Sequence, residues 1–182
     1  MTEDQIIKAI DTVRDSIAQY IELMRMFPRV NVATDADFQR KYNGYYRVRQ
    51  RNKEWYQTYY GFMETQKGHK VTFPDTLRYF KKHLQRYEPS FSSKLVATHD
   101  PNMPIWDTHV LKMLKLKAPD YLSSKKYDRA GAIYREIQKW YSTFIDSQTG
   151  HSIIRKFEEL ITEHNDITNI KKIDFVLWKL GT

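Results

Sequence analysis

The sequence of 182 residues contains no cysteine. This absence excludes disulfides, thiol nucleophiles, cysteine-bound iron–sulfur clusters and cysteine-ligated zinc. The chain also lacks any apolar run of the roughly 18 residues that a membrane-spanning helix needs, and its N-terminal residues lack the basic segment and apolar core of a secretory signal. We therefore expect an intracellular protein, cytoplasmic or nuclear, without a membrane partner.

Positive charge is in excess, because 30 Lys and Arg residues face 22 Asp and Glu residues and leave a formal net charge of +8. Such an excess favours a polyanionic partner such as nucleic acid, although many basic domains bind no such partner. Hydrophobic residues make up 41% of the chain and aromatic residues 14%. This apolar content is enough for folding around one core without a structural metal. We expect a single domain over residues 1–182.

Apolar side chains recur every three or four residues along most of the chain, which is the pattern of amphipathic helices. Thr2 and Gln5 have the spacing of a capping box before the first helix. No strand alternation, internal repeat, low-complexity tract or dividing linker occurs, so the sequence predicts an all-α fold. The predicted helices cover about 6–24, 37–65, 72–84, 90–98, 127–146, 151–163 and 170–180, and a further helix begins at Asp107.

Two neighbouring segments carry the most specific pattern. Residues 89–97 read PSFSSKLVA, and residues 104–110 read PIWDTHV. Together they resemble the core of the helix-hairpin-helix (HhH-GPD) DNA glycosylase superfamily, in which a hairpin is followed by a lysine in its second helix and then by an aspartate that opens the next helix. The resemblance covers about 89–116, with weaker support from 173–178. It implies a compact multi-helix domain with a degenerate helix-hairpin-helix motif at about 75–116.

By this resemblance, Lys94 matches the nucleophilic lysine of the bifunctional enzymes and Asp107 matches the aspartate of the catalytic members. Breaking an N-glycosidic bond develops positive charge on the sugar, which a carboxylate stabilises, and a neutral amine can attack C1′ to form a Schiff base. The resemblance therefore implies a DNA glycosylase, with or without AP lyase activity, that excises a damaged base from duplex DNA. We expect no cofactor, since His99 and His109 lack the carboxylates of a metal-binding pattern.

The match departs from the family in three respects. The usual hairpin glycines are replaced by Ser90 and Ser92, the connector from Lys94 to Asp107 is shorter than in endonuclease III-like members, and the four-cysteine cluster of that branch is absent. A diverged branch without the iron–sulfur cluster, 8-oxoguanine DNA glycosylase-like in preference to endonuclease III-like, fits best. We expect DNA contacts from the hairpin serines and from cations of the preceding helix, namely Ser90, Ser92, Ser93, Lys81, Lys82 and Arg86.

Each candidate also has a structural interpretation. Asp107 has the position of a helix N-cap, because Val110 and Leu111 follow at core spacing, and a cap can coexist with a catalytic carboxylate. Lys94 can be a solvated surface charge. The stretch 40–60 interleaves cations with aromatic rings and could grip nucleic acid, but an amphipathic helix with buried tyrosines explains most of it.

Two other functions stay open at this stage. The lost hairpin glycines fit a basic helical domain that binds nucleic acid without catalysis. The tyrosine-rich segments fit a helical module for protein interaction.

Overall fold

The computed structural model describes residues 1–181, which are helical and contain no strand. The elements are α1 (Glu3–Thr12), α2 (Arg14–Met26), α3 (Ala36–Tyr45), α4 (Lys53–Thr65), α5 (Phe73–Leu84), α6 (Pro89–His99), α7 (Thr108–Met113), α8 (Lys126–Ile145), α9 (Gln148–Leu160), the 3-10 helix η1 (His164–Asp166) and α10 (Asn169–Leu180). The all-α prediction is confirmed. Within residues 1–181, no helix is both long and apolar enough to cross a membrane.

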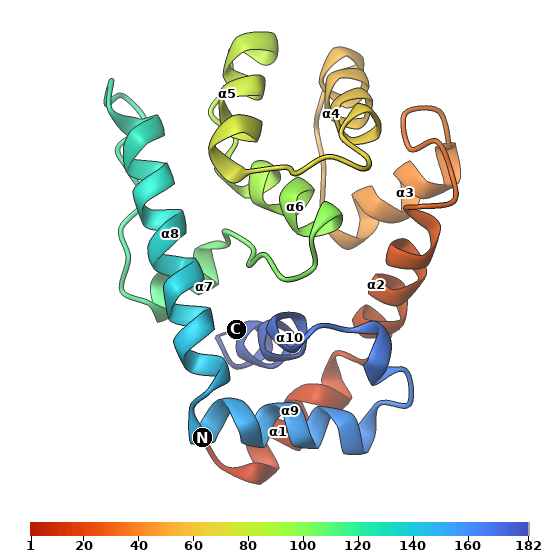
Figure 1. Cartoon of the computed structure of the whole chain (residues 1–182), viewed down its shortest axis with the longest axis vertical. Coiled ribbons are helices and arrows are strands. Elements are labelled where there is room, and N and C mark those ends of the chain that lie inside the picture. Colours follow the sequence, from red (N-terminus) through yellow and green to blue (C-terminus); the bar gives the residue numbers. More distant parts are fainter. Residues whose placement is uncertain (182) are drawn as a thin grey trace.

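The helices form two groups at opposite ends of the molecule (Figure 1). Helices α1, α9 and α10 pack on one another at the lower end, and α4, α5 and α6 lie at the upper end. The long helix α8 runs along one side and contacts α5, α9 and α10, while α2 runs along the other side and contacts α3.

The buried apolar residues form two adjoining clusters, where the sequence predicts one core. The first cluster is built by α1, the first half of α2, and α7 to α10. The second cluster is built by α3, α4 and the end of α2. Helix α6 lies at their border, because Val96 belongs to the first cluster while Leu95 and Ala97 belong to the second. Tyr45 and Val71 pack against both clusters.

The predicted helix over 37–65 is wrong as one element, because residues 46–52 form a loop between α3 and α4. Arg47 and Gln50 adopt left-handed backbone angles, with φ of 54° and 55°, which a right-handed helix does not accept. Asn52 then caps α4, since its side chain accepts a hydrogen bond from the Trp55 amide at 3.0 Å. Residues 46–52 contain no glycine or proline, which is why the sequence conceals the break.

The other predicted helices are present with shifted ends. The predicted first helix is interrupted at Val13, whose backbone leaves helical geometry for one residue between α1 and α2. The capping box of Thr2 and Gln5 at the start of α1 is confirmed. Helices α5, α6, α8, α9 and α10 begin and end within a few residues of their predicted limits.

Candidate active site

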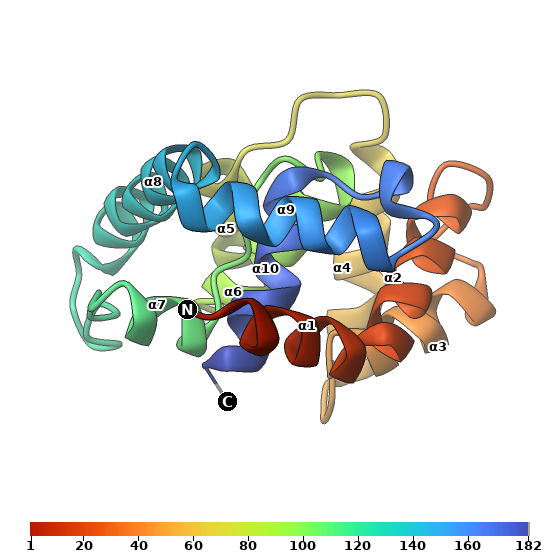
Figure 2. The ribbon, with the colours of Figure 1, turned by 90° about the horizontal axis from the view of Figure 1, so that it is seen from below.

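A cleft of about 490 Å³ lies where the two apolar clusters meet. Its walls come from the corner between α1 and α2, the end of α3, helix α6, the start of α7, and α10. Figure 2 shows three of these parts, namely the light-orange loop after α3, helix α7 and the C-terminal end of α10, toward the lower edge of the molecule. Both sequence candidates, Lys94 and Asp107, line this cleft.

Lys94 lies in the second turn of α6, in surroundings that disfavour its charge. Its Nζ donates a hydrogen bond to the carbonyl oxygen of Tyr46 at 3.3 Å and lies 4.9 Å from the ring centroid of Phe91. Burial lowers the pKa of Lys94; the Asp107 carboxylate opposes this effect, and the positive charges of Lys171 and Arg47 add to it. A lowered pKa increases the fraction of uncharged amine, which is the nucleophilic form of lysine.

Asp107 is the N-cap of α7, as the sequence predicts. Its Oδ1 accepts a hydrogen bond from the backbone amide of His109 at 2.8 Å. Within residues 1–181, its Oδ2 takes no hydrogen bond from protein. One carboxylate oxygen therefore caps the helix, and the other is free to act in the cleft, so the structural and chemical roles are compatible.

A buried hydrogen bond ties together the chain neighbours of the two candidates. The amide of Trp106, next to Asp107, donates to Ser93 Oγ at 2.8 Å, and Ser93 is next to Lys94. The Ser93 hydroxyl donates in turn to the Ser90 carbonyl at 2.9 Å. Trp106 stacks on Phe73 with ring centroids 5.8 Å apart, which fixes the connector against α5. The hydrogen bond between Trp106 and Ser93 sets the position of Asp107 relative to Lys94.

The three serines predicted to contact DNA, Ser90, Ser92 and Ser93, lie in α6, and two of them are not accessible. Ser92 and Ser93 are fully buried, so their hydroxyls do not face a phosphate in solvent. Ser92 Oγ has no hydrogen-bond partner, and Ser93 Oγ is used within the fold. Ser90 is half-buried and is the hairpin serine that remains accessible. The sequence did not reveal this because a serine pattern does not show which face of a helix is packed.

A buried carboxylate lies at the start of α6. Glu88 precedes the helix and gives it no side-chain cap. Its Oε2 lies 3.2 Å from Arg51 Nη2. Burial raises the pKa of Glu88, and the positive charge of Arg51 opposes this rise. Negative charge at this place works against phosphate binding at the start of α6.

The cations expected to bind DNA lie on the surface and outside the cleft. Lys81, Lys82 and Arg86 are exposed on α5 and the turn that follows it. Lys81 Nζ lies 4.5 Å from the ring centroid of Tyr127. They form a basic surface beside the hairpin but do not line the space between Lys94 and Asp107.

The aromatic residues of the 40–60 stretch are mostly core. Tyr42, Tyr46, Trp55, Tyr59 and Tyr60 are all buried in the second cluster. The predicted inward packing of the aromatic residues is confirmed for these five, although the stretch forms α3 and α4 and not one helix. Trp106 is also buried, and the His99 ring packs edge-on against Phe27 with ring centroids 4.9 Å apart.

Sequence reasoning missed Lys171 and Asp174 of α10, which also line the cleft. Lys171 Nζ lies 2.6 Å from Asp174 Oδ2, and both residues are buried. A signal was available, because the two charges stand three positions apart on a face that is otherwise apolar. A buried charged pair in a cleft marks a site for functional study.

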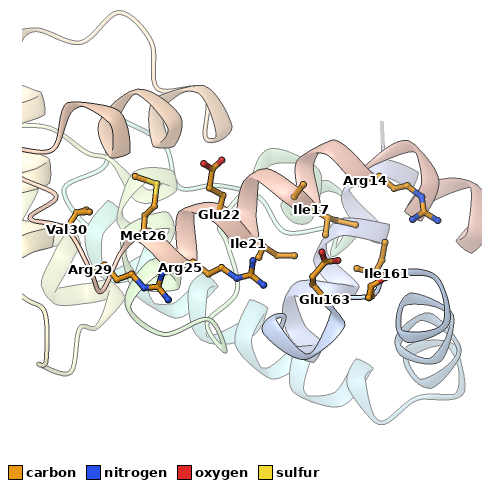
Figure 3. Close-up of a pocket in the computed structure, with 12 residues that line it drawn as sticks. Arg14, Ile17, Ile21, Glu22, Arg25, Met26, Arg29, Val30, Ile161 and Glu163 are labelled. Atoms are coloured by element: carbon orange, nitrogen blue, oxygen red, sulfur yellow. The ribbon is translucent and has the colours of Figure 1, made fainter.

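A second cavity, of about 550 Å³, lies between α2 and the segment after α9. Figure 3 shows Arg25 and Arg29 extending in the same direction from α2 and the turn that follows it. Arg25 is paired with Asp166 at 2.5 Å, and Arg14 with Asp11 at 2.8 Å. Both of these pairs are largely exposed, whereas the cleft at Lys94 brings together a partly buried amine and a carboxylate, so that cleft is the better candidate for chemistry.

Within residues 1–181, no cluster of histidine and carboxylate side chains is arranged to hold a metal ion. Comparison of the chain with protein-family models, curated proteins and solved structures finds no match. The support for the candidate site is therefore its geometry. Lys94, whose pKa is lowered, and Asp107, of which one carboxylate oxygen caps α7, line the same cleft.

Proposed function

We propose that this chain is a DNA glycosylase that excises a damaged base from duplex DNA, with Asp107 stabilising the sugar and Lys94 as the nucleophile of an AP lyase step. The observation that carries the proposal is the joint placement of Lys94 and Asp107 in one cleft, although a whole connector separates them in sequence. The low polarity around Lys94 supports a nucleophilic role, because a lysine at its ordinary pKa is almost entirely protonated near neutrality.

Asp107 and Lys94 have separate roles in the proposed reaction. Departure of the base leaves positive charge on the sugar, which the Asp107 carboxylate stabilises. The uncharged Lys94 amine attacks C1′, and ring opening gives a Schiff base from which the strand is cut by β-elimination. The target nucleotide must leave the helical stack to reach the cleft. The aromatic side chains that line the cleft, Tyr45, Phe91, Phe175 and Trp178, offer faces for the extruded nucleotide.

A second candidate is a domain that binds nucleic acid without catalysis. The observation in its favour is that the cations predicted to bind DNA lie on the surface and outside the cleft, so binding does not require the candidate site. The exposed cations Lys81, Lys82 and Arg86 serve either function.

A borohydride trapping experiment separates the two candidates. Duplexes that carry uracil, 8-oxoguanine, an alkylated purine or an abasic site are incubated with the protein and sodium borohydride, and base release is measured in parallel without borohydride. A trapped covalent complex that Lys94→Gln abolishes identifies the lysine enzyme. Lys139→Gln, which changes an exposed lysine of α8, is the control and should trap like wild type.

The other outcomes are equally informative. Base release without trapping indicates a monofunctional glycosylase that uses Asp107 alone. Binding without release on every duplex rejects the catalytic proposal in favour of the second candidate.

A further inference from the structure

The cleft holds a second lysine whose placement calls for explanation. Lys171 lies in the first turn of α10 and is only 8% exposed. Its Nζ lies 2.6 Å from Asp174 Oδ2, and the other oxygen of that carboxylate accepts a hydrogen bond from the Tyr141 hydroxyl at 3.1 Å. The Lys171 ammonium is therefore held at one place in the wall of the cleft.

Aromatic rings surround this ammonium. Its Nζ lies 4.7 Å from the ring centroid of Phe175, 5.2 Å from that of Tyr20 and 5.9 Å from that of Tyr45. Burial is the largest influence and lowers the pKa of Lys171, but the charge and hydrogen bond of Asp174, together with Tyr46 and Tyr20, outweigh it and raise the pKa. The Asp174 carboxylate at 2.6 Å therefore favours the charged form of Lys171.

Stability alone is a weak reason for this arrangement. A buried ion pair loses the hydration of two charges, and apolar residues of similar volume often replace it with no loss of stability. Lys172, the next residue, forms its own pair with Glu158 at 2.5 Å and does not line the cleft. Of the two buried ion pairs, Lys171–Asp174 is therefore the one that is placed to act on groups in the cleft.

The two lysines approach the same aromatic pair. The rings of Tyr45 and Tyr46 contact each other edge to face with centroids 4.7 Å apart. Lys171 Nζ lies by the ring of Tyr45, while Lys94 Nζ lies 5.7 Å from the ring of Tyr46 and binds its carbonyl oxygen. Tyr46 and Lys171 are both buried, so the two ammonium groups are linked through packed protein as well as across the cleft. Charges interact more strongly across such low-dielectric material than across water.

We propose that Lys171 is a positioning residue for Lys94, and that its fixed positive charge disfavours a second positive charge in the cleft and so favours the uncharged form of the Lys94 amine. The inference deepens the proposed function, and its catalytic meaning rests on that function. It assigns to α10 a part in the chemistry that the resemblance places on α6 and α7.

The other ionisable groups around Lys94 do not replace this effect. From α7, Asp107 acts in the opposite direction and favours the charged form of Lys94, and His109 lines the cleft. From the loop after α3, Arg47 acts in the same direction as Lys171 but is exposed, so solvent and salt screen it. From α10, Asp174 is bound by Lys171 and Tyr141.

The remaining walls add no charge at neutral pH. Tyr45 and Tyr46 are uncharged there because burial raises the pKa of both well above the ordinary value. The corner between α1 and α2 contributes only the uncharged residues Val13, Ser16 and Gln19. Lys171 is thus the buried cation that faces Lys94.

The test measures the protonation of Lys94 directly and needs no DNA. The folded protein is labelled with trace acetic anhydride over a range of pH, and mass spectrometry of peptides gives the reactivity of Lys94 and hence its apparent pKa. The wild-type profile should lie below the ordinary lysine value of about 10.4. Lys171→Met should move the profile to higher pH, which reduces the uncharged fraction of Lys94 near neutrality.

Three further variants identify the cause. Lys171→Arg keeps the charge and should keep the wild-type profile. Lys171→Met/Asp174→Asn removes both charges, leaves no unpaired buried carboxylate, and should still show the upward shift. Lys172→Met removes the neighbouring buried lysine outside the cleft and should leave Lys94 unchanged. A double variant that returns to the wild-type profile would mean that the unpaired Asp174, and not the loss of Lys171, caused the shift, and the proposal would be wrong.

Failure of this inference is distinguishable from failure of the proposed function. If an abasic duplex is trapped but Lys171→Met changes neither the labelling profile nor the pH dependence of trapping, Lys171 has no such role while the lyase assignment stands. If labelling shows the shift but no duplex is ever trapped, Lys171 does act on Lys94 and the lyase assignment fails. A wild-type Lys94 that titrates at its ordinary value overturns the inference without any variant.

Discussion

The replacement Asp107→Asn separates the two roles of this side chain. Asn keeps an oxygen that can accept the hydrogen bond from the His109 amide, which Asp107 Oδ1 accepts at 2.8 Å. Because Asn and Asp are about equally good N-caps, the free energy of unfolding should change by only about 0.5 kcal/mol or less. Asp107→Ala loses the cap and should cost about 1 kcal/mol. The free energies of unfolding of the two variants therefore measure how much Asp107 contributes to stability as a helix cap.

The chemical role has a larger expected effect. Loss of an electrostatic group aimed at a transition-state charge commonly reduces the rate about 100- to 1000-fold, which corresponds to about 3–4 kcal/mol. The loss cannot be attributed to a more protonated Lys94, because the Asp107 charge raises the pKa of Lys94 and its removal lowers that pKa further. The Asn variant should thus have a more nucleophilic lysine and a slower excision.

The assay combines single-turnover base release at saturating protein with thermal unfolding of the same preparations. We expect Asp107→Asn to melt close to wild type, to bind the duplex, and to release the base at least about 100-fold more slowly. An excision rate at the wild-type level in a folded Asn variant would refute the catalytic assignment of Asp107 and leave it as a helix cap.

Four other predictions test the fold and the surface. Burial lowers the pKa of His99 to about 4, so the unfolded state binds more protons between about pH 6.5 and 4, and stability should fall as the pH drops through that window. The full shift corresponds to about 3 kcal/mol, which partial exposure of the ring reduces to about 1–2 kcal/mol, and urea unfolding at pH 7 and pH 4.5 should show this loss in wild type and little of it in His99→Phe. Ser93→Ala leaves the buried Trp106 amide without its acceptor and should cost about 1–3 kcal/mol, whereas Ser92→Ala removes an unpartnered hydroxyl and should cost nothing; equal losses in chemical denaturation would contradict the positioning role of Ser93. Gly150→Ala places a Cβ 2.1 Å from the Phe144 carbonyl oxygen and should be strongly destabilising, whereas Gly61→Ala meets nothing within 4 Å in α4 and should raise the melting temperature by the equivalent of about 0.5–1 kcal/mol. DNA affinity should fall steeply with salt, and Lys81→Gln/Lys82→Gln should make the slope of log affinity against log salt less negative by up to about 2; an unchanged slope would remove these lysines from the interface.

Most helices follow from local information. Apolar spacing and residues such as Thr2 and Asp107, whose side chains cap the helices that follow them, are readable because each depends on neighbours within one turn. The loop at 46–52 is not readable in this way. Its left-handed residues are Arg47 and Gln50, and neither arginine nor glutamine is a residue type that favours this conformation.

The candidate site was foreseen in part. The resemblance pointed to Lys94 and Asp107, and the structure places both in one cleft. What sets their properties comes from distant segments, since the carbonyl that binds Lys94 belongs to Tyr46 and the buried cation beside it belongs to α10. The burial of Ser92 and Ser93 also depends on how α6 packs, which a motif does not contain.

The placement of α6 at the border of the two apolar clusters has a consequence for how the protein holds a ligand. Asp107 belongs to a helix whose Val110 and Leu111 lie in the first cluster, while the wall around Lys94 includes Tyr46 of the second. A nucleotide that contacts both walls joins two units that can otherwise open at different free energies. Under the proposed function, bound substrate should therefore slow amide exchange together in α3 and α7, which contribute to different apolar clusters.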